Sequence, residues 1–152
     1  MMSHNEYLPG RFSSMDKLQN GFLIKSDAHC VLLITFLSND VVRLRYSTDG
    51  QFEEDFSYAL NSRYVPEYPT VVFHEDTTHF KLQSTTFIVN INKSDLKVSF
   101  TDLLGNIICR DEKGFHWEEH QRYGGNIVKM SKVVQEGEHF YGMGDKTMHL
   151  NL

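Results

Sequence analysis

The segment 116–120 carries the residue types of a zinc site, because two histidines and a glutamate follow the order His-x-x-Glu-His. Inverted zinc peptidases have this pattern on a helix, which places both histidines on one face while the glutamate activates a water molecule. Here Gly114 lies just before the pattern and Gly124 just after it, which leaves no room for the long helix of such a site. We therefore expect His116 and His120 to be solvated loop residues that bind no metal.

The phrase from Tyr141 to Thr147 is the second candidate, since two glycines flank one residue and an acid, a base and a hydroxyl follow. A phosphate-binding loop requires lysine directly after its second glycine, whereas Gly142 is followed by Met143. A dinucleotide-binding fingerprint fails too, because its third glycine would fall at Thr147. We expect no cofactor here and interpret the phrase as a strand that runs into a tight turn, where glycine supplies the backbone freedom.

Acidic and aromatic residues gather in the segment 47–70, which also holds two of the three prolines. Its adjacent acids, Glu53 to Asp55, resemble a carboxylate cluster for acid–base chemistry, but neighbouring acids on a loop are usually solvated. Its aromatic side chains would either form a stacking surface for sugar rings or pin the segment against a sheet. We expect a long crossover between strands, with one helical turn near residues 56–60. The aromatic residues are Phe52, Phe56, Tyr58, Tyr64 and Tyr68.

The elements that must position these residues are strands, because apolar and polar side chains alternate with a period of two along much of the chain. Residues 31–37 are apolar on both faces and indicate a central strand. Turn signals recur about every ten residues, a spacing typical of sandwiches and barrels, and no segment has a helical period of any length. We predict an all-β fold, an antiparallel β-sandwich. Its expected core includes Val31, Leu33, Val42, Leu44, Phe87, Val89, Val98 and Phe100.

The composition excludes several function classes. The 152 residues suit one domain, with residues 1–18 expected as a lead-in segment and 19–152 as the sandwich. A net charge of −5 with interspersed acids and bases disfavours nucleic acid as a partner. No run of about 18 apolar residues exists, so no membrane span is expected. No signal peptide is visible, which predicts a cytoplasmic protein with Cys30 and Cys109 as buried, reduced thiols.

The end of the chain resembles a known family. In glycoside hydrolase family 31, the α-glucosidase family, the N-terminal β-sandwich ends in a phrase like Glu-x-Phe-Tyr-Gly-Leu-Gly-Glu-Lys, and residues 138–146 are similar to it. The strand 41–46, the phrase 55–60 and the hairpin 96–106 resemble further phrases of that family, so the resemblance covers about residues 20–150. The matching terminal residues are Glu138, Phe140, Tyr141, Gly142, Met143, Gly144, Asp145 and Lys146, with Met for Leu and Asp for Glu as departures.

The resemblance implies a galactose mutarotase-like supersandwich that precedes a catalytic (β/α)8 barrel in a retaining α-glycosidase. Such enzymes use two carboxylates about 5–5.5 Å apart as nucleophile and acid/base. The family's nucleophile lies in a Trp-x-Asp-Met-type phrase, which this chain lacks, and a barrel alone takes about 250 residues. We therefore expect no catalytic residue here. The expected role is a non-catalytic domain, truncated before its barrel, whose partners are that barrel and the carbohydrate substrate at the rim of its pocket.

The terminal turn is the expected point of contact with the rest of such an enzyme. Its interdomain or pocket-side candidates are Gly142, Gly144, Asp145 and Lys146, for which shaping the turn itself is the other expected role. The apolar face near Phe140, Tyr141 and Met143 would lie exposed in the fragment, which predicts self-association. Two other functions stay open: a free-standing carbohydrate-binding module that uses the aromatics of 52–68, and a mutarotase-like enzyme.

Overall fold

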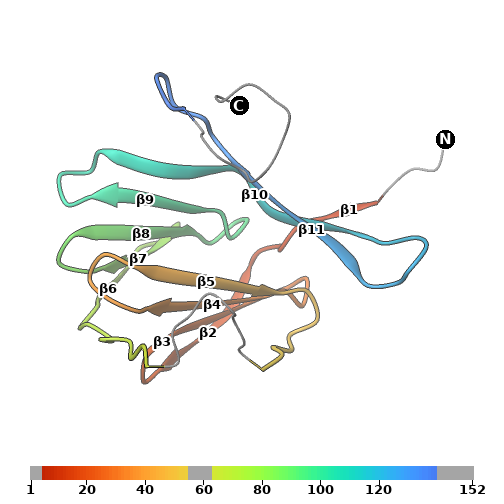
Figure 1. The fold of residues 1–152 in the computed structure, drawn as a ribbon, viewed down its shortest axis with the longest axis horizontal. Helices are drawn as coiled ribbons and strands as arrows, with labels where there is room; N and C mark the ends of the chain where they lie inside the picture. Colours follow the sequence, from red (N-terminus) through yellow and green to blue (C-terminus); the bar gives the residue numbers. More distant parts are fainter. Residues whose placement is uncertain (1–4, 55–62, 140–152) are drawn as a thin grey trace.

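Two antiparallel sheets face each other in this computed structural model, which describes residues 5–54 and 63–139 (Figure 1). The smaller sheet has four strands in the order β2-β3-β4-β5. No helix occurs in the described residues, and the antiparallel β-sandwich predicted from the alternation is confirmed. The four strands are β2 (Phe12–Leu18), β3 (Gly21–Ser26), β4 (Val31–Phe36) and β5 (Val42–Ser47).

The larger sheet has seven strands in the order β1-β10-β9-β8-β7-β6, and β11 pairs with β10 as well. Strand β10 reaches three neighbours, because it pairs with β9 along its first half and with β1 and β11 along its second half. The second half leaves the sandwich together with β11, and we call these residues, 114–131, the β10–β11 arm (Figure 1). The seven strands are β1 (Glu6–Tyr7), β6 (Val72–Glu75), β7 (His79–Gln83), β8 (Phe87–Asn92), β9 (Val98–Asp102), β10 (Ile107–Glu119) and β11 (Asn126–Lys132).

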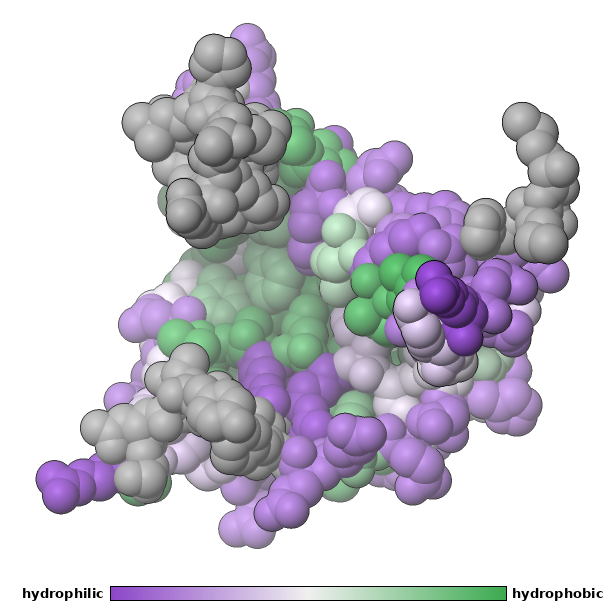
Figure 2. All heavy atoms as spheres, turned by 45° about the vertical axis from the view of Figure 1, so that its right-hand side comes forward, coloured by the Kyte–Doolittle hydropathy of each residue, from purple (hydrophilic) through white to green (hydrophobic). Residues whose placement is uncertain are grey.

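The main core lies between the two sheets, because successive side chains of a strand point to opposite faces and the apolar set turns inward. Figure 2 shows hydrophobic side chains gathered between the sheets. The expected core residues Phe87, Val89 and Val98 are buried in this core, and Val31 is buried outside it. Three others are half-buried and pack against the core, namely Val42, Leu44 and Phe100.

The prediction for Leu33 is wrong. Strand β4 is apolar on both faces, so its sequence does not say which face turns inward. Pairing with β3 and β5 decides this, since the buried residues of β4 include Leu32 and Ile34, and Leu33 takes the opposite face. Leu33 is therefore only half-buried, on the outer side of the four-stranded sheet. The expectation of a central strand at 31–37 is confirmed, because β4 lies between β3 and β5.

Two strands, β1 and β2, lie within the segment expected as a lead-in, and each belongs to one of the sheets. Strand β2 shows no clear alternation, and it forms because β3 offers it an edge to pair with. The first residue of β2, Phe12, packs edge-on against Phe80 of the other sheet with ring centroids 4.8 Å apart. Its amide also donates a hydrogen bond to the carbonyl of Lys93 at 2.8 Å. This segment thus helps to close the sandwich.

A bulge divides β10 at the base of the arm, where the pairing register with β11 shifts between Asp111 and Gly114. Gly114 has a φ of +76°, and a Cβ at this position would lie 2.7 Å from Oδ2 of Asp111. Glycine is therefore required both for the backbone conformation and for the space that the carboxylate occupies. Because a bulge bends the strand that carries it, this one directs the arm away from the sandwich.

Candidate functional site

The terminal turn predicted as the functional loop lies outside the described residues. The same holds for Phe56, Tyr58 and the helical turn expected near 56–60. In the part of the chain that the structure describes, buried polar groups gather at the base of the β10–β11 arm. The predicted residues outside the description are Gly142, Gly144, Asp145 and Lys146, with Phe140, Tyr141 and Met143 beside them.

Strand geometry separates the two histidines of the His-x-x-Glu-His pattern. His116 lies on β10 and is buried, so the expectation of a solvated loop residue is wrong for it. His120 does lie in the hairpin turn, where its Nδ1 accepts hydrogen bonds from the amides of Arg122 and Tyr123 at 3.3 and 3.1 Å. Residues four apart on a strand are separated by about 13 Å, too far to share one metal ion. Within residues 5–54 and 63–139, no group of three His, Cys, Asp or Glu is placed to hold a metal.

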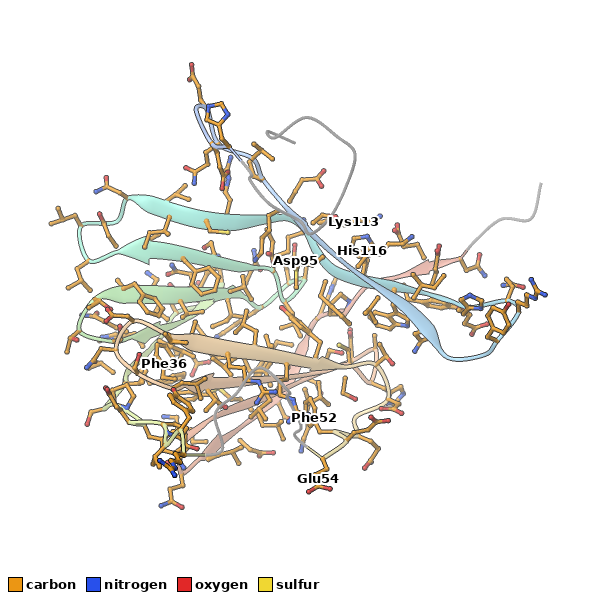
Figure 3. The ribbon with its side chains drawn as sticks, viewed as in Figure 1. Phe36, Phe52, Glu54, Asp95, Lys113 and His116 are labelled. Carbon is orange, nitrogen blue, oxygen red and sulfur yellow. The ribbon has the colours of Figure 1, made fainter. Side chains whose placement is uncertain are left out.

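The buried imidazole of His116 ties β1 to the base of the arm (Figure 3). Its Nδ1 donates a hydrogen bond to the carbonyl of Gly114 at 2.9 Å, since a carbonyl can only accept. Its Nε2 lies 3.3 Å from Oε1 of Glu6, and the other oxygen of that carboxylate pairs with Lys113. Glu6 belongs to the two-residue strand β1, so these contacts hold a very short strand in place.

A second carboxylate, Asp111, is almost fully buried on the other side of the bulge, with 1% of its side chain exposed. Its Oδ2 accepts a hydrogen bond from the amide of Val98 at 2.8 Å, and its Oδ1 pairs with Nζ of Lys132 at 2.5 Å. A buried carboxylate is costly unless it is paired and hydrogen-bonded. Asp111 therefore joins β10 to the first residue of β9 and the last residue of β11, which fixes the origin of the arm.

Tyr46 and Phe115 stack beside this cluster and link β5 of the small sheet to β10 of the large one. Trp117 and Cys30 complete a small second core. The hydroxyl of Tyr46 is buried without a hydrogen-bond partner in the described structure. Burial, with the nearby negative charge of Asp111, raises the pKa of this hydroxyl far above its usual range. Burial also raises the pKa of the Cys30 thiol to about 11, so it stays protonated at neutral pH.

The two cysteines are free thiols, as predicted from the sequence. Cys30 is buried, whereas Cys109 on β10 is only half-buried, so the expectation of two buried thiols is confirmed for Cys30 alone.

The aromatic and acidic residues of the segment 47–70 that the structure describes do not form one surface. Phe52 is held under the guanidinium of Arg45, 4.9 Å from the ring centroid, and Arg45 also donates to the carbonyl of Glu53 at 3.0 Å. Phe52 thus pins the connection to the outer face of the small sheet. Glu54 is exposed, as expected for a solvated acid, and Figure 3 shows it pointing away from the sandwich. Tyr64 and Tyr68 are also exposed.

The β10–β11 arm is amphipathic, because residues directly opposite each other on paired strands share a face. On one face Trp117 opposes Tyr7 and Val128, and Phe115 opposes Met130. The other face is charged: Lys129 pairs with Glu118 at 3.1 Å, next to the buried His116 and its partner Glu6.

The apolar face is covered along β10 but not along β11. Trp117 and Phe115 are buried, whereas Val128 is 60% exposed and Met130 is 46% exposed. Figure 2 shows an apolar patch on the arm beside the hydrophilic hairpin tip. Exposed apolar patches are where interaction sites are commonly found, which makes this face a candidate. Sequence reasoning missed it, because the apolar residues of Asn126–Lys132 do not alternate strictly with polar ones, so the sequence does not say which face is apolar or whether it is covered. The described residues contain no helix that is long and apolar enough to span a membrane.

Residues 31–152 match a protein family, the glycosyl hydrolase 31 N-terminal galactose mutarotase-like domain. A relative among characterised proteins is alpha-glucosidase 2 of Bacillus thermoamyloliquefaciens, which is 28% identical over 127 residues. That alignment covers 81% of this chain but 15% of the relative. The chain therefore spans only about one seventh of the relative it matches.

Solved structures show the same fold. A GH31 dextranase of Flavobacterium johnsoniae, a mutant complexed with isomaltotriose, superposes with a TM-score of 0.74 at 22% identity. This superposition covers 95% of the present chain and 17% of the dextranase. The cycloalternan-forming enzyme of Listeria monocytogenes, in complex with a pentasaccharide substrate, has a TM-score of 0.70 at 15% identity, with 96% of this chain and 14% of that enzyme covered.

Proposed function

Because the chain belongs to the family of glycosyl hydrolase 31 N-terminal galactose mutarotase-like domains, we propose that it is the non-catalytic N-terminal domain of an α-glucosidase-like enzyme. The family match over residues 31–152 is the observation that carries this proposal. The parent enzyme would cleave α-glycosidic bonds with retention, through two carboxylates supplied by a separate catalytic barrel. The sandwich would support that barrel and the rim of its sugar pocket.

The exposed part of the arm is the surface that we assign to contact with the barrel. Val128 and Met130 on β11 extend an apolar face whose β10 side, at Phe115 and Trp117, is already packed in the second core. A partner seated there would continue that core, so the contact would be coupled to the sandwich rather than confined to the arm. Asp111 with Lys132, and Glu6 with His116, hold the arm in the orientation that presents this face.

A free-standing carbohydrate-binding module is not favoured as the function. The family that the chain matches consists of N-terminal domains of glycosyl hydrolases. The proposed platform of five aromatics also loses Phe52, because Arg45 covers its ring.

Reconstitution from two pieces tests the proposal. The 152-residue chain and the polypeptide encoded downstream of it in the same gene are purified separately and assayed with an aryl α-glucoside. We expect no hydrolysis by the chain alone, and an active, soluble enzyme when both pieces are combined. Hydrolysis by the chain alone, or a gene that encodes no catalytic barrel downstream, would overturn the proposal.

Two substitutions locate the contact in the same assay. Changing Val128 to Lys places a charge on the exposed apolar face of the arm and should weaken association of the two pieces at least about tenfold. The matched control is Leu104→Lys, because Leu104 is an apolar residue of the β9–β10 turn that is 89% exposed. Equal weakening by both substitutions, or by neither, would show that the arm is not the contact surface.

A further inference from the structure

A pocket of about 320 Å³ lies between the β2–β3 turn and the segment 68–71. This end of the sandwich is opposite the β10–β11 arm (Figure 1). Ligand pockets start at about 300 Å³, so the volume suits one small ring rather than a long chain. Its described lining comes from the β2–β3 turn, from core side chains of β3 and β4, and from the connection to β6. The lining residues that matter here are Lys17, Gln19, Asn20, Phe22, Phe36 and Tyr68.

The floor of the pocket is aromatic and rigid. Phe22 stacks on Phe73, and Phe36, labelled in Figure 3, stacks on Phe87, each with ring centroids 5.8 Å apart. The turn above the floor is pressed against β4, because a Cβ on Gly21 would lie 2.3 Å from the carbonyl oxygen of Ile34. The floor of the pocket and the backbone of the turn above it are therefore held by packing.

Tyr68 forms the wall of the pocket in a conformation that tyrosine rarely adopts, with a φ of +47°. A bulky residue at positive φ is an outlier, and the following Pro69 restricts the backbone of Tyr68 further toward extended forms. The neighbouring backbone is anchored, since the amide of Glu67 donates to the carbonyl of Leu37 at 2.8 Å. Strain of this kind persists where surrounding structure holds it, and it concentrates at ligand-binding sites. Tyr68 is nonetheless 42% exposed, so burial of its ring does not explain the conformation.

The lining of the pocket holds two neutral side-chain amides and one ammonium group. The side-chain amides of Gln19 and Asn20 have no hydrogen-bond partner among the described residues, and together they offer donors and acceptors. No carboxylate occurs in the described lining. The one charged group, Nζ of Lys17, lies 4.0 Å from the ring centroid of Phe73.

We propose that this pocket binds a single neutral hexopyranose unit, stacked on Tyr68 and hydrogen-bonded by Gln19 and Asn20. A pyranose ring has one face of C–H groups that packs on an aromatic ring, and a rim of hydroxyls that donate and accept. The pocket offers matching partners for both, in the Tyr68 ring and in the side-chain amides of Gln19 and Asn20. The choice of a glucose-containing probe rests on the proposed function. The inference that the pocket binds a pyranose ring rests on its lining residues alone.

Titration of the isotope-labelled 152-residue chain with maltose, followed by NMR, tests the inference. We expect saturable shifts confined to the amides of residues 17–22 and 68–71. Sorbitol is the control ligand, because it carries similar hydroxyls but has no ring face to stack. Shifts that are absent, that lie elsewhere, or that sorbitol reproduces would each overturn the inference.

Three variants separate ring stacking from folding. Tyr68→Gly removes the ring and accepts the positive φ, so it should stay folded and bind maltose at least about tenfold more weakly. Tyr68→Phe keeps the ring and should bind as the parent chain does. Tyr64→Ala is the matched control, since Tyr64 is exposed in the same connection but does not line the pocket. Unchanged binding by Tyr68→Gly would refute the site while leaving reconstitution with the catalytic barrel unaffected.

Discussion

The rings of Tyr46 and Phe115 lie nearly parallel, at 7°, with centroids 4.3 Å apart, and they join the two sheets at the base of the arm. The Tyr46 hydroxyl has no hydrogen-bond partner in the described structure, so no hydrogen bond compensates for its desolvation. We expect Tyr46→Phe to leave the free energy of unfolding unchanged or to raise it by up to about 1 kcal/mol. Tyr46→Ala should lower it by about 3 kcal/mol or more, because a cavity replaces the stack. Urea denaturation measures both, and a large loss with Tyr46→Phe would reveal a hidden partner.

The buried Asp111 gives a second prediction. Lys132→Met removes its counter-ion while the carboxylate stays buried, and we expect a loss of about 3 kcal/mol in the free energy of unfolding. Lys129→Met is the control on the same strand, because Lys129 pairs at 3.1 Å with Glu118 nearer the surface. That change should cost at most about 1 kcal/mol. Equal losses in thermal or urea denaturation would argue that Asp111 does not depend on Lys132.

The two thiols should react at different rates. Cys30 is buried and burial raises its pKa to about 11, so little thiolate forms at neutral pH. Cys109 is half-buried on β10 and more accessible. A thiol reagent at pH 8 should label Cys109 first, and Cys30 only after unfolding in urea. Mass spectrometry of the labelled peptides decides the order, which rapid native labelling of Cys30 would contradict.

The turn between β6 and β7 should make stability fall in acid. The amides of Thr78 and His79 donate to the carboxylate of Asp76, each at 2.8 Å, and hold its pKa well below its usual value of 3.8. A lowered folded-state pKa stabilises the fold above the unfolded-state pKa, and this stability is lost as the pH falls below it. Asp76→Asn should therefore flatten the decline of the melting temperature below about pH 4.

The control for that measurement is Asp40→Asn. Asp40 is exposed, and its carboxylate accepts no hydrogen bond within the described residues. We expect the melting temperature of this variant to follow the parent curve throughout the acid range. A decline as shallow as that of Asp76→Asn would show that the turn is not responsible.

Metal removal should have no effect on stability. His116 Nδ1 and Nε2 already face Gly114 and Glu6, and His120 supports the hairpin turn. We expect a chelator to leave the melting temperature unchanged. We also expect His120→Ala to cost about 1 kcal/mol through its lost hydrogen bonds alone. One tightly bound zinc per chain, lost in His120→Ala, would contradict this prediction.

The alternation of apolar and polar residues was sufficient to predict the antiparallel sandwich, because a strand with one buried face must repeat with a period of two. The phrase at 138–146, taken together with 41–46, 55–60 and 96–106, likewise predicted the family, which the match over residues 31–152 confirms. Where both faces of a strand are apolar, as in β4, the local pattern could not say that Leu32 rather than Leu33 turns inward. Pairing of β4 with β3 and β5 determines which face turns inward.

Only the tertiary structure decided the surroundings of the polar residues. Glu6 meets His116 and Lys113 across more than 100 positions of sequence, so no local pattern could place that histidine in the interior. The bend at Gly114 depends on the buried Asp111, which in turn depends on Lys132 of another strand. The pocket beside Tyr68 forms where the β2–β3 turn meets a distant connection. Local periodicity fixes which side of a strand is apolar, whereas long-range pairing fixes what each side meets.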